Sequence, residues 1–146
     1  MKNQLITILS SFFCYLILTN SIQAQESIFD KLNAIATVDE KVMMPMRDGV
    51  RLASDIYRPK EAGKYPIIFS RTPYNFNSWG DGEQRTRTAK SAYEYVKKGY
   101  AYVVQNERGR FYSEGEWDIL GVPLTDGYDA FEWMKNQAWS NGKIGT

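Results

Sequence analysis

The spacing of hydrophobic and polar residues changes several times along the chain, and these changes predict a series of strands. Segment 40–46 is rich in apolar residues, and segment 51–57 shows the two-residue alternation of a strand. Asp48-Gly49 lies between them and is a strong tight-turn signal, so the two strands are expected to form a β-hairpin. Segments 65–70 and 100–105 are short apolar runs typical of strands buried on both faces.

Other segments repeat their apolar residues at helical spacing. Segment 86–98 is expected to be a helix that ends at Gly99, because glycine is favoured just past a helix. A second helix is expected to begin at Asp126, whose carboxylate can bind the free amides of the first turn. The two apolar faces are Ala89, Ala92, Tyr93 and Val96, and Ala130, Phe131, Met134 and Ala138. A shorter amphipathic helix fits Ile28, Leu32 and Ile35.

The order of these elements indicates the fold class. Loops are expected at 58–63, 75–84 and 106–125, and Asn141-Gly142 is expected to turn into a last strand over 143–146. A hairpin is thus followed by alternating strands and helices, which predicts an α/β fold with a parallel sheet and right-handed crossovers. Such an opening is typical of an α/β-hydrolase. A dinucleotide-binding fold is not favoured, because the chain lacks its Gly-x-Gly-x-x-Gly turn.

The amino terminus has the layout of a secretory signal peptide. Lys2 precedes an apolar run from Leu5 to Leu18, and Ser21 to Ala24 supply a cleavage region. We therefore divide the chain into a signal peptide at 1–24, a linker at 25–39 and an incomplete hydrolase domain at 40–146. The predicted location is secreted or periplasmic, without stable membrane association after cleavage. An uncleaved anchor is the alternative, although the run is shorter than the roughly 20 residues of a membrane span.

Composition narrows the possible chemistry. The net charge is +1 with interspersed signs, which gives no support for binding nucleic acid. The only cysteine, Cys14, leaves with the signal peptide, so disulfides cannot stabilise the mature protein. Without histidine, and without cysteine after cleavage, the sequence predicts no metal site. No cofactor is implied, and the oligomeric state is left open.

A set of ordered motifs from about Glu40 to Thr146 resembles the Xaa-Pro dipeptidyl-peptidase, cocaine esterase and α-amino-acid ester hydrolase family. Each motif is weak alone, and their shared order and spacing make the resemblance specific. The motifs are Met44 to Leu52, Asp55 to Pro59, Arg71 to Tyr74, Gln105 to Arg110, Ser113 to Glu116, Asp126 to Trp133 and Asn141 to Gly145.

The resemblance implies a serine hydrolase that cleaves small ester, amide or peptide substrates through an acyl-enzyme. The tyrosine of the Arg-x-Pro-Tyr segment donates its hydroxyl to the oxyanion in such proteins, and Tyr74 stands at this position. The alternative is that Tyr74 packs at a strand end. A Gly-x-Ser-x-Gly elbow is absent, so Ser70, Ser78 and Ser113 are poor nucleophiles, and the triad cannot be assembled without histidine. The triad serine is expected shortly after Thr146, with aspartate and histidine later.

Several other residues have two interpretations. Arg108 either lines the acyl pocket or forms a structural ion pair with Glu107, Glu114 or Asp126. The loop aromatics Trp79, Phe111, Tyr112 and Trp117 either line that pocket or pack the loops. Asp126 and Asp129 have a spacing that suits a helix start better than an acid–base pair.

Two alternatives to this function remain. The first is an α-amino-acid ester hydrolase or β-lactam acylase, and the second is a short exported binding module without catalytic activity. The second alternative leaves the last strand as an exposed sheet edge, which is a pairing hazard.

Overall fold

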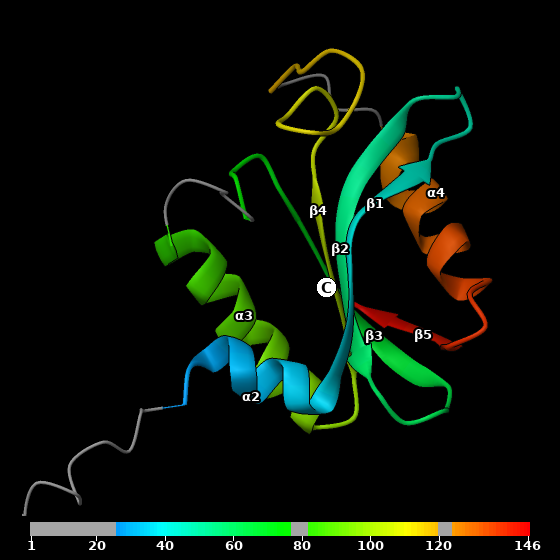
Figure 1. The fold of residues 1–146 in the computed structure, drawn as a ribbon. Coiled ribbons are helices and arrows are strands. Elements are labelled where there is room, and N and C mark those ends of the chain that lie inside the picture. Colours follow the sequence, from blue (N-terminus) through cyan, green and yellow to red (C-terminus); the bar gives the residue numbers. More distant parts are fainter. Residues whose placement is uncertain (1–25, 77–81, 120–123) are drawn as a thin grey trace, which may run out of the picture.

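The computed structural model describes residues 26–76, 82–119 and 124–146, and the predicted signal peptide and Trp79 lie outside them. Five strands form one sheet in the order β1-β2-β4-β3-β5 (Figure 1). The strands are β1 (Ala36–Pro45), β2 (Arg51–Pro59), β3 (Tyr65–Thr72), β4 (Ala101–Asn106) and β5 (Ser140–Gly145). The helices are α2 (Ile28–Ile35), α3 (Gly82–Lys97) and α4 (Leu124–Lys135).

The sheet combines an antiparallel hairpin with a parallel part, as the sequence predicted. β1 pairs with β2, and β2 pairs with β4, in antiparallel fashion. β3 is parallel to both β4 and β5. The chain moves from β3 to β4 in one direction across the sheet and from β4 to β5 in the other. Right-handed crossovers therefore place α3 and α4 on opposite faces (Figure 1).

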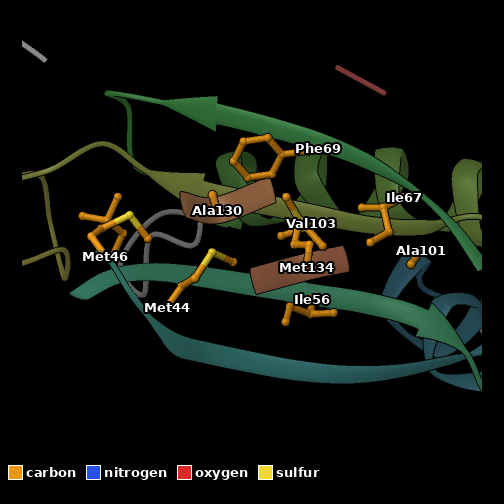
Figure 2. Close-up of a cluster of buried hydrophobic side chains, with 10 residues drawn as sticks. Met44, Met46, Ile56, Ile67, Phe69, Ala101, Val103, Ala130 and Met134 are labelled. Carbon is orange, nitrogen blue, oxygen red and sulfur yellow. The ribbon is translucent and has the colours of Figure 1, made fainter. Parts of the chain in front are cut away.

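Each face of the sheet buries its own apolar cluster. On the α4 face, Met44, Ile67, Val103 and Met134 pack together with almost no exposed surface (Figure 2). On the other face, α2 and α3 cover a second cluster of buried residues. This second cluster consists of Leu32, Ala36, Tyr57, Phe76, Ala89, Ala92, Val96, Tyr102 and Val104. This burial confirms the apolar faces predicted for α2 and α3. Hydrophobic packing of one face supplies most of the stability of such helices.

The hairpin begins earlier than the sequence pattern indicated. β1 starts at Ala36 rather than at residue 40, so the segment expected to be a linker contains α2 and the start of a strand. The register shifts between Asp39 and Val42, and Lys41 has a φ of 54°. The Lys41 N–H donates to Asp55 Oδ1 at 2.8 Å. The predicted boundary depended on the apolar-rich run 40–46, whereas the strand continues to earlier residues on the other side of this irregularity.

The carboxyl-terminal part also differs from the prediction. Ala138, expected on the second helix, is exposed and follows the end of α4 at Lys135. The chain turns here, where the Gln137 side-chain amide donates to the Trp133 carbonyl at 2.9 Å. The turn predicted at Asn141-Gly142 is wrong, since both residues lie within β5. Gly142 has a φ of 81°, and the pairing of β5 with β3 is irregular beside it.

Candidate active site

The carboxyl ends of β3 and β4 lie side by side, because the parallel register pairs Thr72 with Asn106. The chain continues from these ends into segments 73–76 and 107–119, neither of which contains a helix or strand. Open α/β sheets bind ligands at the carboxyl ends of their strands, so we take this edge as the candidate site. Tyr74, Arg108 and Phe111, which the sequence proposed as site residues, all follow these two strands.

Tyr74 combines a fixed backbone with an exposed side chain. Its N–H donates to Thr72 Oγ1 at 3.1 Å, and its carbonyl accepts from Asn106 Nδ2 at 2.9 Å. The residue as a whole is 72% exposed. The phenol can therefore meet a ligand above the sheet edge while hydrogen bonds hold the backbone. Whether it donates to an oxyanion stays a prediction.

Asn106 was not singled out by the sequence. It is fully buried, and its Nδ2 also lies 3.4 Å from the Thr72 carbonyl. Its Oδ1 has no hydrogen-bond partner within the described part of the chain. The polar pair Gln105 and Asn106 at the end of an apolar buried strand is the signal that could have found it. Asn106 links the end of β4 to the segment that carries Tyr74.

A cavity of about 230 Å³ opens beside Tyr74, between α3 and the face formed by β3 and β4. Polar groups from Ser70, Thr72, Ser91 and Tyr102 contribute to its wall. Burial raises the pKa of the Tyr102 phenol, so this group stays protonated and able to donate. The cavity is smaller than the roughly 300–1,000 Å³ of most ligand pockets and suits a small group.

Arg108 is buried and forms ion pairs with two carboxylates. Its Nε and Nη2 donate to Asp126 at 3.0 and 2.7 Å, and its Nη1 lies 2.8 Å from Asp48 Oδ2. Hydrogen bonds to Asp126 and then Asp48 raise the pKa of Arg108, and the Arg108 guanidinium lowers the pKa of Asp48. The ion pair with Asp126 was one of the predicted alternatives and is confirmed. A role for Arg108 in the acyl pocket stays a prediction.

The other acidic residues proposed as partners of Arg108 bind elsewhere. Glu107 accepts from the Trp117 indole N–H at 3.2 Å, and Glu114 forms an ion pair with Arg51. Asp48 was missed because it lies in the distant hairpin turn. It reaches Arg108 only when the sheet forms.

The sequence predicted that the second helix would begin at Asp126, and this prediction is wrong. α4 starts at Leu124, and Asp126 is 1% exposed with both carboxylate oxygens bound to Arg108. Asp129 instead accepts from the Arg47 backbone N–H at 2.9 Å and forms an ion pair with its guanidinium. The two carboxylates are thus bound by different arginines. This arrangement supports the structural interpretation over an acid–base pair.

A buried polar chain connects three strands below the edge. Arg71 donates to Gln105 Oε1 at 2.9 and 2.7 Å, and Gln105 Nε2 donates to Ser54 Oγ at 3.0 Å. Arg71 Nη2 also donates to the Asp126 carbonyl at 2.7 Å, which connects β3 to α4. Burial lowers the pKa of Arg71. Because these polar groups satisfy one another, they can be buried beneath the edge at little cost.

Aromatic side chains gather on the loop after β4. Phe111 is 48% exposed and has a φ of 52°, and Trp117 is 39% exposed. The guanidinium of Arg110 lies 4.6 Å from the centre of the Trp117 ring system and 5.1 Å from that of Phe111. Tyr112 contacts the Lys41 ammonium instead, at 3.9 Å. Phe111 and Trp117 therefore flank one cation at the candidate site, and their contact with substrate stays a prediction.

Two features of the described residues concern metal ions and membranes. Within residues 26–76, 82–119 and 124–146, no group of three or more histidine, cysteine or acidic side chains is placed to hold a metal ion. Among the helices of these same segments, none has the length and apolar character needed to cross a membrane.

The strand order, the helices on both faces and the loops at the carboxyl edge define the α/β-hydrolase class. Residues 48–146 match the X-Pro dipeptidyl-peptidase (S15) family, and the chain belongs to this family. The family resemblance predicted from the sequence motifs is thereby confirmed.

Several proteins that are similar to this chain carry the names of hydrolases. The chain is 42% identical over 110 residues to cocaine esterase from Rhodococcus sp. (strain MB1 Bresler), a match covering 75% of this chain and 18% of that protein. It is similar to the structure of an α-amino acid ester hydrolase, with 31% identity, a TM-score of 0.62 and coverage of 87% and 23% of the two chains. A CocE/NonD family hydrolase from Staphylococcus aureus gives 27% identity, a TM-score of 0.67 and coverage of 76% and 23%. The chain thus spans about a fifth of the length of these relatives.

Proposed function

We propose that this chain supplies the first part of the catalytic domain of a secreted serine hydrolase. The enzyme cleaves small esters, amides or peptides, and Tyr74 donates a hydrogen bond to the oxyanion. One observation carries the proposal: the exposed phenol of Tyr74 stands on a hydrogen-bonded backbone at the carboxyl end of β3, in a family of esterases and peptidases.

The proposed chemistry uses Tyr74 at one step of acyl transfer. A serine hydroxyl attacks the substrate carbonyl, its proton passes to a base, and negative charge develops on the carbonyl oxygen. A donor fixed before the reaction stabilises that charge without reorganising, and such a donor typically contributes about 3 kcal/mol. Collapse of the intermediate expels the alcohol or amine, and water then hydrolyses the acyl-enzyme.

The remaining catalytic groups lie outside these 146 residues under this proposal. The chain has no histidine, so the base cannot come from it, and no serine stands in a Gly-x-Ser-x-Gly elbow. The 146 residues alone are accordingly expected to be inactive. The signal-like segment at 1–24 supports export.

A second candidate within the same chemistry is an α-amino-acid ester hydrolase. The likeness to a solved enzyme of that name, at 31% identity, favours it. The two candidates share the Tyr74 step and differ in the acyl group. Comparing α-amino esters with simple benzoate esters as substrates distinguishes them.

The Tyr74 assignment predicts the effect of Tyr74→Phe in the product of the complete gene. We expect kcat for a chromogenic ester to fall about a hundredfold, because one oxyanion donor is lost. The melting temperature should stay unchanged, since the phenol is exposed. Tyr128→Phe is a matched control, because Tyr128 is 61% exposed and lies on α4 rather than after β3. Full activity of Tyr74→Phe would contradict the oxyanion assignment.

A further inference from the structure

We propose that Arg110 is a positioning residue for Tyr74, an inference that rests on the proposed function. Arg110 Nε donates to the Pro73 carbonyl at 3.0 Å. This carbonyl belongs to the peptide group that joins Pro73 to Tyr74. Arg110 therefore acts on the orientation of the residue that carries the proposed oxyanion donor, without touching the substrate.

The peptide group before Tyr74 is held at both of its polar atoms. Arg110 binds its carbonyl oxygen, and Thr72 Oγ1 accepts from its N–H at 3.1 Å. Because a peptide group is planar and hydrogen bonds are directional, these two bonds restrict rotation of the plane from which the Tyr74 backbone continues. Asn106 then holds the next carbonyl, that of Tyr74 itself, at 2.9 Å. These hydrogen bonds set the direction of the Tyr74 Cα–Cβ bond, from which the side chain begins.

Arg110 is itself held in place by the loop after β4. Its backbone N–H donates to the Glu107 carbonyl at 3.0 Å, and its carbonyl accepts from the Ser113 N–H at 2.9 Å. Its guanidinium lies near the rings of Phe111 and Trp117, at 5.1 and 4.6 Å. A planar guanidinium stacks on aromatic rings and keeps its N–H directions fixed, which an ammonium group does not. The aromatic pair thus has a role in aiming Arg110.

Positioning matters here because oxyanion stabilisation depends on the placement of the donor. A shift of about 1 Å caused by a residue away from the reacting atoms can lower a rate by about a hundredfold. The Pro73–Tyr74 segment follows the end of β3, where the strand no longer restrains it. The Thr72 side chain at the end of β3 and side chains from β4 and its loop supply the restraint instead.

A double-mutant cycle in the product of the complete gene tests this inference. Arg110→Leu removes the donor and keeps much of the apolar stem, so kcat should fall about tenfold with little change in KM. The same substitution in a Tyr74→Phe background should change kcat less than about twofold, because no hydroxyl remains to be positioned. Arg110→Lys should lose as much as Arg110→Leu, since it keeps the charge without the planar group.

Each other outcome has a definite meaning. An equal loss in both backgrounds, or full activity of Arg110→Lys, would overturn the positioning role, because Arg110 would then act independently of Tyr74 or by charge alone. An unchanged kcat in Arg110→Leu would also overturn the positioning role. If Tyr74→Phe still lost activity in that case, the proposed function would remain supported. An unchanged kcat in Tyr74→Phe would contradict both the oxyanion role of Tyr74 and the positioning role of Arg110. Arg58→Leu is the control, because Arg58 pairs with Asp39 on the hairpin and should leave kcat unchanged.

Discussion

At the scale of single residues, two glycines with positive φ have different surroundings. Gly109, in the loop that carries Arg110, has a φ of 68°, and a Cβ at this position would lie 2.2 Å from the backbone nitrogen of Trp117. Gly49, in the hairpin turn, has a φ of 86°, and a Cβ there would meet no atom within 4 Å. Glycine is therefore favoured at position 109 for two reasons: the backbone is left-handed, and the Trp117 backbone approaches closely. At position 49 only the left-handed backbone favours glycine.

Alanine substitutions separate these two requirements. Gly49→Ala should lower the free energy of unfolding by about 1–2 kcal/mol, the cost of a left-handed conformation. Gly109→Ala should cost about 1–3 kcal/mol more, because the added methyl group overlaps backbone atoms that cannot move independently. Denaturant unfolding of both variants measures the difference. Equal losses would contradict the close approach of the loop at Gly109.

At the scale of elements, Arg108 joins three separate parts of the chain. It lies in the loop after β4, and it binds Asp48 in the β1–β2 turn and Asp126 in the first turn of α4. Arg47 and Asp129 form a second bridge between the same turn and α4. These contacts fix the hairpin turn and α4 to the site edge, and apolar packing alone does not specify that arrangement.

Removal of one carboxylate tests the importance of the buried bridge. Asp126→Asn should lower the free energy of unfolding by about 3 kcal/mol, because it leaves the buried Arg108 with only the partly exposed Asp48. Asp129→Asn is the matched control, and its loss should be clearly smaller because Arg47 is exposed to solvent. Similar small losses of unfolding free energy in both variants would mean that the buried Arg108–Asp126 ion pair contributes no more to stability than the exposed one.

At the scale of the whole molecule, the sheet is covered on both faces and open at its β5 edge. α2 and α3 cover one face, and α4 covers the other (Figure 1). β5 pairs only with β3 among the described strands. In the α/β-hydrolase class, the nucleophile stands on a turn that follows a strand of the parallel sheet. Under the proposed function, the nucleophile is therefore expected in the coding sequence beyond Thr146.

The proposed function makes a prediction at this scale. The gene should continue past codon 146 with a Gly-x-Ser-x-Gly elbow shortly after β5, followed by aspartate and then histidine in chain order. Sequencing the gene and its transcript checks this directly. A stop codon after Thr146 would contradict the serine hydrolase and favour a binding module. In that case a soluble monomeric protein with cooperative melting is expected, despite the open edge.

The sequence alone determined the features that depend on local patterns. The apolar face of α3, the Asp48-Gly49 hairpin and the strands β3 and β4 follow from residue spacing, and all are present in the structure. β4 is buried along its whole length as predicted, whereas β3 is fully buried only at Ile67 and Phe69. The motifs were sufficient to predict the family, which residues 48–146 confirm. Periodicity and turn chemistry act over a few residues, so a single sequence reveals them.

Tertiary structure alone decided which side chains meet at the site. Arg110 reaches the Pro73 carbonyl and Arg108 reaches Asp48 only because the sheet brings separate loops to one edge. The Lys41 N–H binds Asp55 and the Asp126 carboxylate binds Arg108, and no local pattern specifies either contact. The physical reason is that an ion pair or hydrogen bond depends on distance in space, whereas residue patterns report only neighbours along the chain.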